Sequence, residues 1–150
     1  TEDRKKLWKA RHEVYYSVKA LRPNTRVYTT DACVPISRLA ECIKFTEEKI
    51  KEYGLQAPIV GHVGDGNFHC TVLYDPKKEG DHKTIREFSN QLINKTLELD
   101  GTVTGEHGIG INKKEYLIKQ HKDNIPLMQI IKKNIDPKNI MNPGKVFDIN

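Results

Sequence analysis

Two histidines, His62 and His69, flank a glycine-rich turn in a stretch that otherwise has the pattern of two β-strands. If Asp65 and Gly66 form the two-residue turn that Asp-Gly favours, the strands pair so that His62 lies directly opposite His69. Side chains in those positions have Cβ atoms roughly 4.5–5.5 Å apart, close enough for both imidazoles to bind one metal ion. The alternative is that one or both rings are core histidines bonded to the backbone. The spacing alone leaves both interpretations open.

A second group of reactive side chains lies in the segment Gly105-Glu106-His107-Gly108-Ile109-Gly110. Glycines permit a tight backbone beside a ligand, Glu106 offers a carboxylate, and His107 offers a base that can be tuned to neutral pH. The segment lacks the Gly-Lys-Ser/Thr of a phosphate-binding loop, which argues against a nucleotide cradle. Combined with the hairpin, it adds Glu106 as a third candidate ligand. Two histidines and one glutamate form an open site suited to zinc or manganese.

Arg11 is the third candidate. It stands in the helical series Leu7, Arg11, Val14, Val18, so it points with the apolar face of its helix. A charge in that position must be paired. Its partner is either an internal Asp or Glu, or the carboxylate of a substrate that the guanidinium binds through two N–H groups.

The elements that must position these residues follow from hydrophobic periodicity and from helix and strand breakers. The pattern predicts helices over residues 2–21, from Pro35 to Gly54, from about 85 to 99, and over about 112–120 and 125–134, with strands over 26–34, 57–63, 68–74 and 102–104. The central order of strand, helix, strand, strand, helix, strand is that of an α+β, ferredoxin-like split βαβ fold. Its sheet is antiparallel with both helices on one face, and the extra N- and C-terminal helices cover the sheet or dock elsewhere.

Composition limits the function classes. The 150 residues are enough for one domain and not comfortably for two. The net charge of +5 is spread along the chain without a basic stripe set with aromatics, which argues against a nucleic-acid partner. No apolar run reaches the length of about 20 residues that a transmembrane segment needs. The three cysteines, with no Cys-x-x-Cys spacing, fit small buried hydrophobes in a reducing compartment.

Three motifs occur in order along the chain: Gly61-His62-Val63-Gly64-Asp65-Gly66-Asn67-Phe68-His69, Gly105-Glu106-His107-Gly108-Ile109-Gly110 and Met141-Asn142-Pro143-Gly144-Lys145. Together they resemble the C-terminal domain of FAD-linked oxidases of the vanillyl-alcohol oxidase type. Two further stretches, residues 7–12 and 30–39, resemble more narrowly the mitochondrial D-lactate dehydrogenase (cytochrome) branch of that family. The resemblance covers nearly the whole chain.

The resemblance implies an FAD-dependent dehydrogenase of D-2-hydroxy acids that oxidises D-lactate to pyruvate, with cytochrome c or a quinone as electron acceptor. Three residues would hold a divalent metal, zinc or manganese: His62, His69 and Glu106. His107 would take the hydroxyl proton while hydride leaves for the flavin, and Arg11 would anchor the substrate carboxylate. Asn142 and Lys145 would help close the site or contact the flavin.

The same resemblance sets the expected domain organisation. The FAD-binding domain that precedes this region in the family is absent from this chain, so residues 1–150 are expected to be a single C-terminal domain, inactive alone. Thr29 and Thr71 stand where the D-2-hydroxyglutarate branch has Lys and Asn, which favours D-lactate over a dicarboxylate. The alternatives are a glycolate or D-2-hydroxyglutarate dehydrogenase domain, or a non-catalytic metal-binding or interaction module. The resemblance implies a mitochondrial location, and without it a cytoplasmic one is expected.

Overall fold

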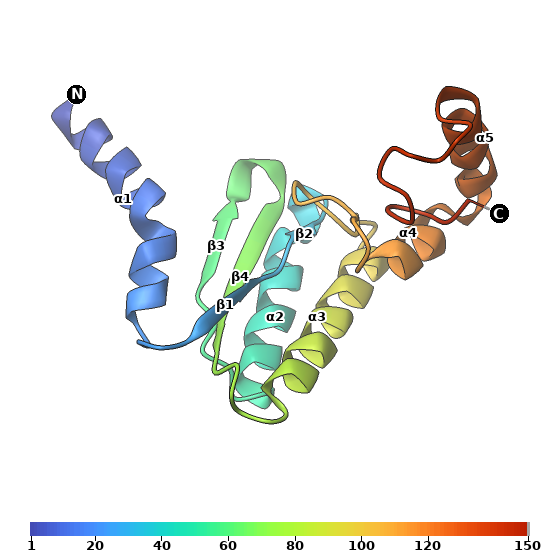
Figure 1. The fold of residues 1–150 in the computed structure, drawn as a ribbon. Helices are drawn as coiled ribbons and strands as arrows, with labels where there is room; N and C mark the ends of the chain where they lie inside the picture. Colours follow the sequence, from blue (N-terminus) through green and yellow to red (C-terminus); the bar gives the residue numbers. More distant parts are fainter. Residues whose placement is uncertain (150) are drawn as a thin grey trace.

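The core forms around a central strand, β4 (Asn67–Tyr74), in which Phe68, Cys70 and Val72 alternate with more polar residues. In the computed structural model, which describes residues 1–149, these three side chains are almost fully buried against α2 (Leu39–Glu52) and α3 (Asp81–Glu98). Both helices lie on the same face of the sheet (Figure 1). Because side chains of a strand alternate between faces, His69 and Thr71 lie on the opposite face.

Apart from the strand predicted over residues 102–104, the elements follow the predicted order and lie close to the predicted bounds. The remaining ones are α1 (Glu2–Ala20), β1 (Arg26–Thr29), β2 (Ala32–Cys33), η1 (Ile36–Arg38), β3 (Ile59–His62), η2 (Val63–Asp65), α4 (Lys114–His121), η3 (Lys122–Asn124) and α5 (Ile125–Ile135). The prediction of an α+β domain with a small antiparallel sheet and additional helices at both ends is confirmed. None of the described helices is both long enough and apolar enough to cross a bilayer.

The sheet places β3 on one side of β4 and both β1 and β2 on the other, all antiparallel. Thr29 pairs with Thr71 and Ala32 pairs with Phe68, so β1 and β2 share one register along β4. They are therefore two parts of a single predicted strand, interrupted at residues 30–31.

The predicted hairpin register is wrong. His62 pairs with Asn67, and His69 pairs with Val60. The turn holds residues 63–66 rather than two residues, because η2 forms one short helical turn and Gly66 closes it with a φ of 72°. A Cβ at Gly66 would lie 2.0 Å from the Val34 carbonyl oxygen, so only glycine fits there. His62 and His69 are consequently diagonal neighbours on one face, with ring centroids 6.2 Å apart.

The predicted strand over residues 102–104 is reduced to an isolated bridge between Thr102 and Cys33. The chain leaves the sheet there because the carboxylate of Asp31 accepts hydrogen bonds from the backbone N–H groups of the residues that follow, including Gly105 and His107. Groups bonded to a side chain cannot continue a strand ladder. Within residues 1–149 the sheet therefore lacks the full fourth strand of a ferredoxin-like arrangement.

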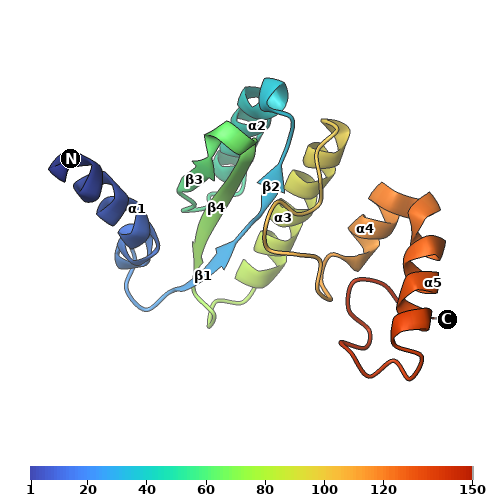
Figure 2. The same ribbon diagram turned by 90° about the horizontal axis from the view of Figure 1, so that it is seen from above.

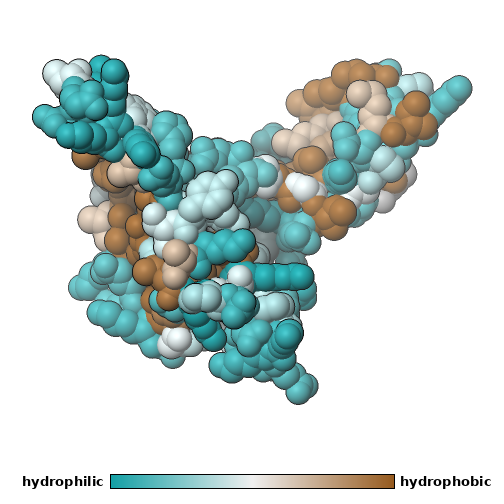
Figure 3. All heavy atoms as spheres, turned by 60° about the vertical axis from the view of Figure 1, so that its left-hand side comes forward, coloured by the Kyte–Doolittle hydropathy of each residue, from teal (hydrophilic) through white to brown (hydrophobic). Residues whose placement is uncertain are grey.

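The terminal helices extend away from the sheet instead of covering it (Figures 1 and 2). In α1 only Val18 is buried, and Leu7 and Tyr16 are 73% and 71% exposed. No residue of α5 is buried, and Ile130, Ile135 and Ile140 at and beyond this helix are exposed. Figure 3 shows hydrophobic atoms gathered on the C-terminal arm, which consists of α5 and the segment after it, residues 125–149.

Candidate metal centre

The three predicted ligands, His62, His69 and Glu106, converge on the sheet face opposite α2 and α3. One ligand atom from each lies within 4.8 Å of the others. The Nε2 of His69 is 2.7 Å from Glu106 Oε1, and the Nε2 of His62 is 3.9 Å from the same oxygen. The β3–β4 hairpin supplies both imidazoles, and the loop after the Cys33–Thr102 bridge supplies the carboxylate.

The hydrogen bonds of His69 show that this donor set fits a cation. Its Nδ1 lies 3.0 Å from the carbonyl oxygen of Thr30, which can only accept, so Nδ1 carries a proton. In the neutral ring Nε2 then presents a lone pair, and it faces the carboxylate oxygen of Glu106, another acceptor. A proton on Nε2 satisfies this contact, and a metal ion bound by both atoms satisfies it equally. A backbone carbonyl that fixes the far nitrogen is also the usual support of a histidine metal ligand.

Asp31 organises the loop that carries Glu106, and sequence reasoning did not identify it. Its side chain is 1% exposed. The carboxylate accepts hydrogen bonds at 2.7–3.1 Å from Oγ1 of Thr104 and from the N–H groups of Gly105, Glu106 and His107. Burial by itself raises the pKa of the Asp31 carboxyl, but these hydrogen bonds and the charge of Lys113 outweigh burial and leave the pKa below 3.8. The sequence signal that could have identified it is an acidic residue inside a predicted strand.

His107 stacks on His69 with ring centroids 4.8 Å apart and planes 4° from parallel. Its Nε2 lies 3.9 Å from Glu106 Oε1, and its side chain is 43% exposed. Asp31, His69 and His107 form a second possible ligand set. The first set is favoured because the Asp31 oxygens already accept backbone and hydroxyl hydrogen bonds. The His107 imidazole then lies beside the ligand cluster, and the hydrogen bond to Asp31 comes from the His107 backbone N–H and not from its ring.

Arg11 reaches the same face from α1. Its Nη2 lies 3.0 Å from Nδ1 and 2.9 Å from Nε2 of His62, although the two residues are 51 positions apart. No aspartate or glutamate in residues 1–149 forms an ion pair with Arg11. Of the two alternatives left open by the sequence, the internal carboxylate is therefore not found, and the guanidinium lies over the hairpin.

Asn142 and Lys145 are not brought to the cluster. Lys145 Nζ donates to Asn142 Oδ1 at 3.2 Å, and both residues are exposed. They belong to the C-terminal arm, which lies on the far side of α3 from the hairpin in both ribbon views (Figures 1 and 2). The arm returns toward the loop after Glu106 at one point, where the N–H of Val146 donates to the carbonyl of Gly110 at 2.8 Å.

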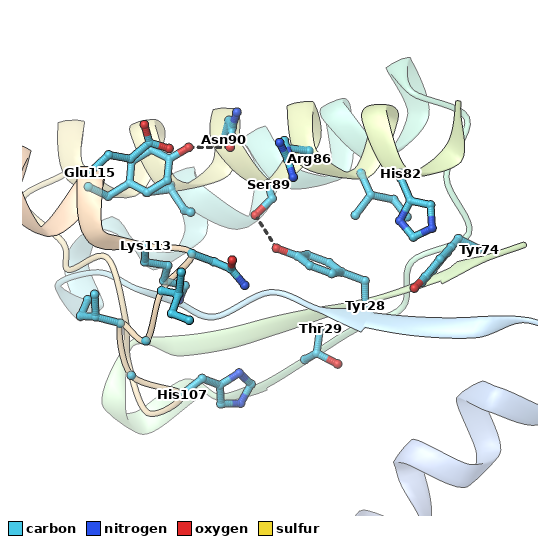
Figure 4. A pocket seen from close by; sticks show the side chains of 18 residues that line it. Tyr28, Thr29, Tyr74, His82, Arg86, Ser89, Asn90, His107, Lys113 and Glu115 are labelled. Atoms are coloured by element: carbon cyan, nitrogen blue, oxygen red, sulfur yellow. Dashed lines mark hydrogen bonds between the residues drawn. The ribbon is translucent and has the colours of Figure 1, made fainter. Parts of the chain in front are cut away.

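A groove of about 630 Å³ lies between β1, α3 and residues 107–116, and sequence reasoning gave no sign of it. Figure 4 shows Tyr28 of β1 facing Ser89 of α3 across it, with His107 at one side. The Tyr28 hydroxyl and Ser89 Oγ are 3.1 Å apart. His107 therefore borders both the groove and the ligand cluster.

Comparison with known proteins gives one family and several relatives. The model of the FAD linked oxidases, C-terminal domain, matches residues 1–146. A probable mitochondrial D-lactate dehydrogenase of Danio rerio is 44% identical over 99% of this chain and 30% of its own length. The mitochondrial D-lactate dehydrogenase [cytochrome] of Arabidopsis thaliana is 38% identical over 97% of this chain and 26% of its own. The glycolate oxidase subunit GlcD of Bacillus subtilis is 36% identical over 94% of this chain and 30% of its own length.

Among solved structures, 4-ethylphenol oxidase from Gulosibacter chungangensis, in its isoeugenol complex, superposes with a TM-score of 0.65 at 22% identity. The match covers 96% of this chain and 30% of that one. At this identity the likeness shows a shared fold. The chain spans less than a third of the length of each of these relatives.

Proposed function

The chain belongs to the FAD-linked oxidases, as their C-terminal domain, and from this membership we propose that it supplies the metal- and substrate-binding half of an FAD-dependent D-lactate dehydrogenase. The product is pyruvate, and the electrons pass to cytochrome c or a quinone. The part of the flavoprotein outside these residues holds most of the FAD. Two relatives named as mitochondrial D-lactate dehydrogenases, at 44% and 38% identity, support the substrate and a mitochondrial location.

The observation that carries the proposal is the convergence of His62, His69 and Glu106, with His69 Nε2 2.7 Å from Glu106 Oε1. These residues would hold a divalent metal, zinc or manganese. Such a metal would supply Lewis-acid polarisation of the substrate oxygens, and FAD would supply the hydride acceptor. Asp31 positions Glu106 for this role through the backbone hydrogen bonds of its loop.

His107 is proposed as the base that takes the hydroxyl proton of the substrate. Its Nε2 is on the cluster side, 3.9 Å from Glu106 Oε1, and its ring is open to solvent and hence to a substrate. The stack on His69 and the N–H bond to Asp31 hold the ring in place without occupying its nitrogens. A base must be within hydrogen-bond reach of the proton it removes, and this position beside the ligands provides that reach.

Arg11 is proposed to bind the substrate carboxylate. Arginine only donates, so its contact with His62 uses the one lone pair of the neutral imidazole. A metal held by His62 would occupy that lone pair, so Arg11 would lose this acceptor. A carboxylate bound through two N–H groups would then be a suitable partner for the guanidinium.

Thr29 and Thr71 support a small monocarboxylate as substrate. They pair directly across β1 and β4, and Thr71 lies two residues from His69 on the same face. Neither side chain offers a positive charge to a second carboxylate. The glycolate oxidase subunit at 36% identity keeps glycolate, which lacks only the methyl group of lactate, as the second candidate substrate.

Flavin reduction in the full-length flavoprotein tests the proposal. We expect rapid bleaching of the oxidised flavin absorbance by D-lactate, slower bleaching by glycolate, and the slowest by D-2-hydroxyglutarate and L-lactate. Glycolate as the fastest substrate would assign the second candidate. If none of these acids reduces the flavin, the proposed function is wrong, and a non-catalytic metal-binding or interaction module becomes the favoured alternative.

A further inference from the structure

Asn67 is the first residue of β4, and the mechanism proposed above gives it no role. It stands two positions before His69, so the two side chains lie on the same face of the strand. It also pairs directly across the hairpin with His62, and side chains in such positions have Cβ atoms roughly 4.5–5.5 Å apart. Asn67 is therefore a neighbour, within the sheet, of both candidate histidine ligands.

The carboxamide of Asn67 packs against the loop that carries Glu106. Asn67 is only 6% exposed. A Cβ added at Gly105 would lie 2.6 Å from Oδ1, 2.7 Å from Cγ and 2.8 Å from Nδ2 of Asn67. Since all three atoms are about equally close, the flat face of the amide rests on the Gly105 backbone. This contact holds the amide beside the candidate ligands.

The carbonyl oxygen of this amide lacks a hydrogen-bond donor. Asn67 Oδ1 is buried, and no group in residues 1–149 donates to it. Neighbouring donors are used elsewhere, since the N–H of Gly105 donates to Asp31 at 2.9 Å. The thiol of Cys33, which pairs with Asn67 from β2, points to the carbonyl of Asp65 at 3.7 Å. An unpaired buried acceptor lowers stability, and an apolar side chain of similar size would avoid that cost.

His62 has the complementary deficiency, an N–H without an acceptor. A neutral imidazole carries one lone pair and one N–H, and the contact with Arg11 uses the lone pair. Oε1 of Glu106, at 3.9 Å from His62 Nε2, lies beyond hydrogen-bond distance. For His69, by contrast, the carbonyl of Thr30 accepts from Nδ1 at 3.0 Å. Of the two candidate histidine ligands, only His69 has its second nitrogen fixed by the described residues.

We propose that Asn67 is a positioning residue of the metal centre: with one nitrogen of His62 on the metal, the other would donate to Asn67 Oδ1. Histidine metal ligands almost always donate their second N–H to an acceptor, and that bond fixes the ring and raises its basicity. The side chain of His62 is 37% exposed, which leaves the ring room to turn toward its cross-strand neighbour. The inference rests on the proposed function in taking His62 as a ligand.

Zinc affinity of the full-length, FAD-loaded flavoprotein tests the proposal, with zinc returned to the metal-free protein in competition with a chromogenic chelator. Asn67→Leu removes the acceptor and should raise the Kd for zinc by about 10–100-fold. The melting temperature of the metal-free protein should not fall, because the substitution removes an unpaired polar atom. Asn94→Leu, at an exposed position of α3, is the matched control and should change neither. An unchanged Kd in Asn67→Leu overturns the proposal.

Two further variants separate the hydrogen bond from packing. Asn67→Asp keeps the planar outline and an acceptor oxygen, so it should bind zinc as tightly as the parent. Asn67→Ala removes the acceptor without adding bulk against Gly105, so it should weaken zinc binding even if Asn67→Leu folds poorly. Equal affinities of Asn67→Asp and Asn67→Ala overturn the proposal.

Nitrogen NMR of labelled histidine side chains observes the bond directly in the parent protein at saturating zinc. The ring N–H of His62, identified by its absence from His62→Ala, should exchange slowly with water, and Asn67→Leu should abolish that protection. Rapid exchange in the zinc-loaded parent overturns the proposal, and the proposed function survives if D-lactate still reduces the flavin in that preparation. A parent that binds neither zinc nor manganese overturns this proposal and the ligand assignment together.

Discussion

The loop that carries Glu106 and the helix that carries Arg11 both reach His62 and His69, but they are held there differently. The loop is fixed from beneath by the buried carboxylate of Asp31. Helix α1 reaches the same face through an exposed arginine, with only Val18 buried along its length. The difference separates two tasks. The candidate metal ligands are positioned by contacts within this chain, whereas the group proposed for the substrate remains free to exchange partners.

The largest effect is expected from removing the anchor of the loop. Asp31→Ala leaves several partly buried N–H groups unpaired and removes the ion-pair partner of Lys113, and should lower the free energy of unfolding by about 3–5 kcal/mol. Urea denaturation of the chain measures it. The control Asp148→Ala removes an exposed carboxylate that pairs with Lys114 and should cost less than about 1 kcal/mol. Equal effects of the two substitutions would mean that Asp31 does not anchor the loop.

Removing a ligand should leave the fold intact and abolish metal binding. His62→Ala deletes one of three convergent donors on a half-exposed side chain, so zinc or manganese should no longer bind stoichiometrically while the melting temperature stays near that of the parent. Metal analysis after dialysis compares the two proteins. His82→Ala, on α3 and outside both candidate ligand sets, serves as the control. Equal metal content in the His62 and His82 variants would remove His62 from the ligand set.

The difference between the two regions predicts that Arg11 affects kinetics and not stability. In the full-length enzyme Arg11→Met should leave the melting temperature unchanged and reduce kcat/KM for D-lactate by an amount worth about 2–5 kcal/mol. Lys9→Met is the control and should change neither; Lys9 is on the same helix and, within residues 1–149, pairs with the exposed Glu13. A large fall in melting temperature with intact kinetics would make Arg11 structural, and α1 as firmly held as the loop.

The smallest effect is a pH dependence of stability. The pKa of Asp31 is lowered in the folded chain from 3.8, because its hydrogen bonds and Lys113 outweigh burial. The folded state therefore binds fewer protons, and the stabilisation from Asp31 is complete above about pH 5 and lost as the pH falls below 3.8 through the folded pKa. Urea denaturation between pH 6 and pH 3 should show a shallower fall in the Asp31→Asn variant than in the parent. Identical slopes would exclude Asp31 as a source of acid sensitivity.

Local chemistry determined much of this protein from the sequence. Periodic apolar residues and breakers such as Pro35 and Gly54 place the helices, since these signals act within a few residues along the chain. The types of His62, His69 and Glu106 indicate a metal site, because imidazole and carboxylate ligands are recognisable in any fold. The prediction of their convergence was correct even though the predicted register was wrong, because a shift of two residues keeps a side chain on the same face of a strand.

Long-range contacts decided the rest. The turn at residues 63–66 follows from the packing of Gly66 against Val34, which lies more than 30 residues away in the sequence. Residues 102–104 do not form a full strand because of Asp31, about 70 positions earlier in the sequence. Its buried carboxylate competes with the sheet for backbone N–H groups. The contact of Arg11 with His62 likewise depends on where α1 leaves the sheet. A sequence pattern reports the conformational preferences of each residue and its near neighbours. These three outcomes depend instead on which residues, distant in the sequence, lie close enough in the folded chain to contact the same groups.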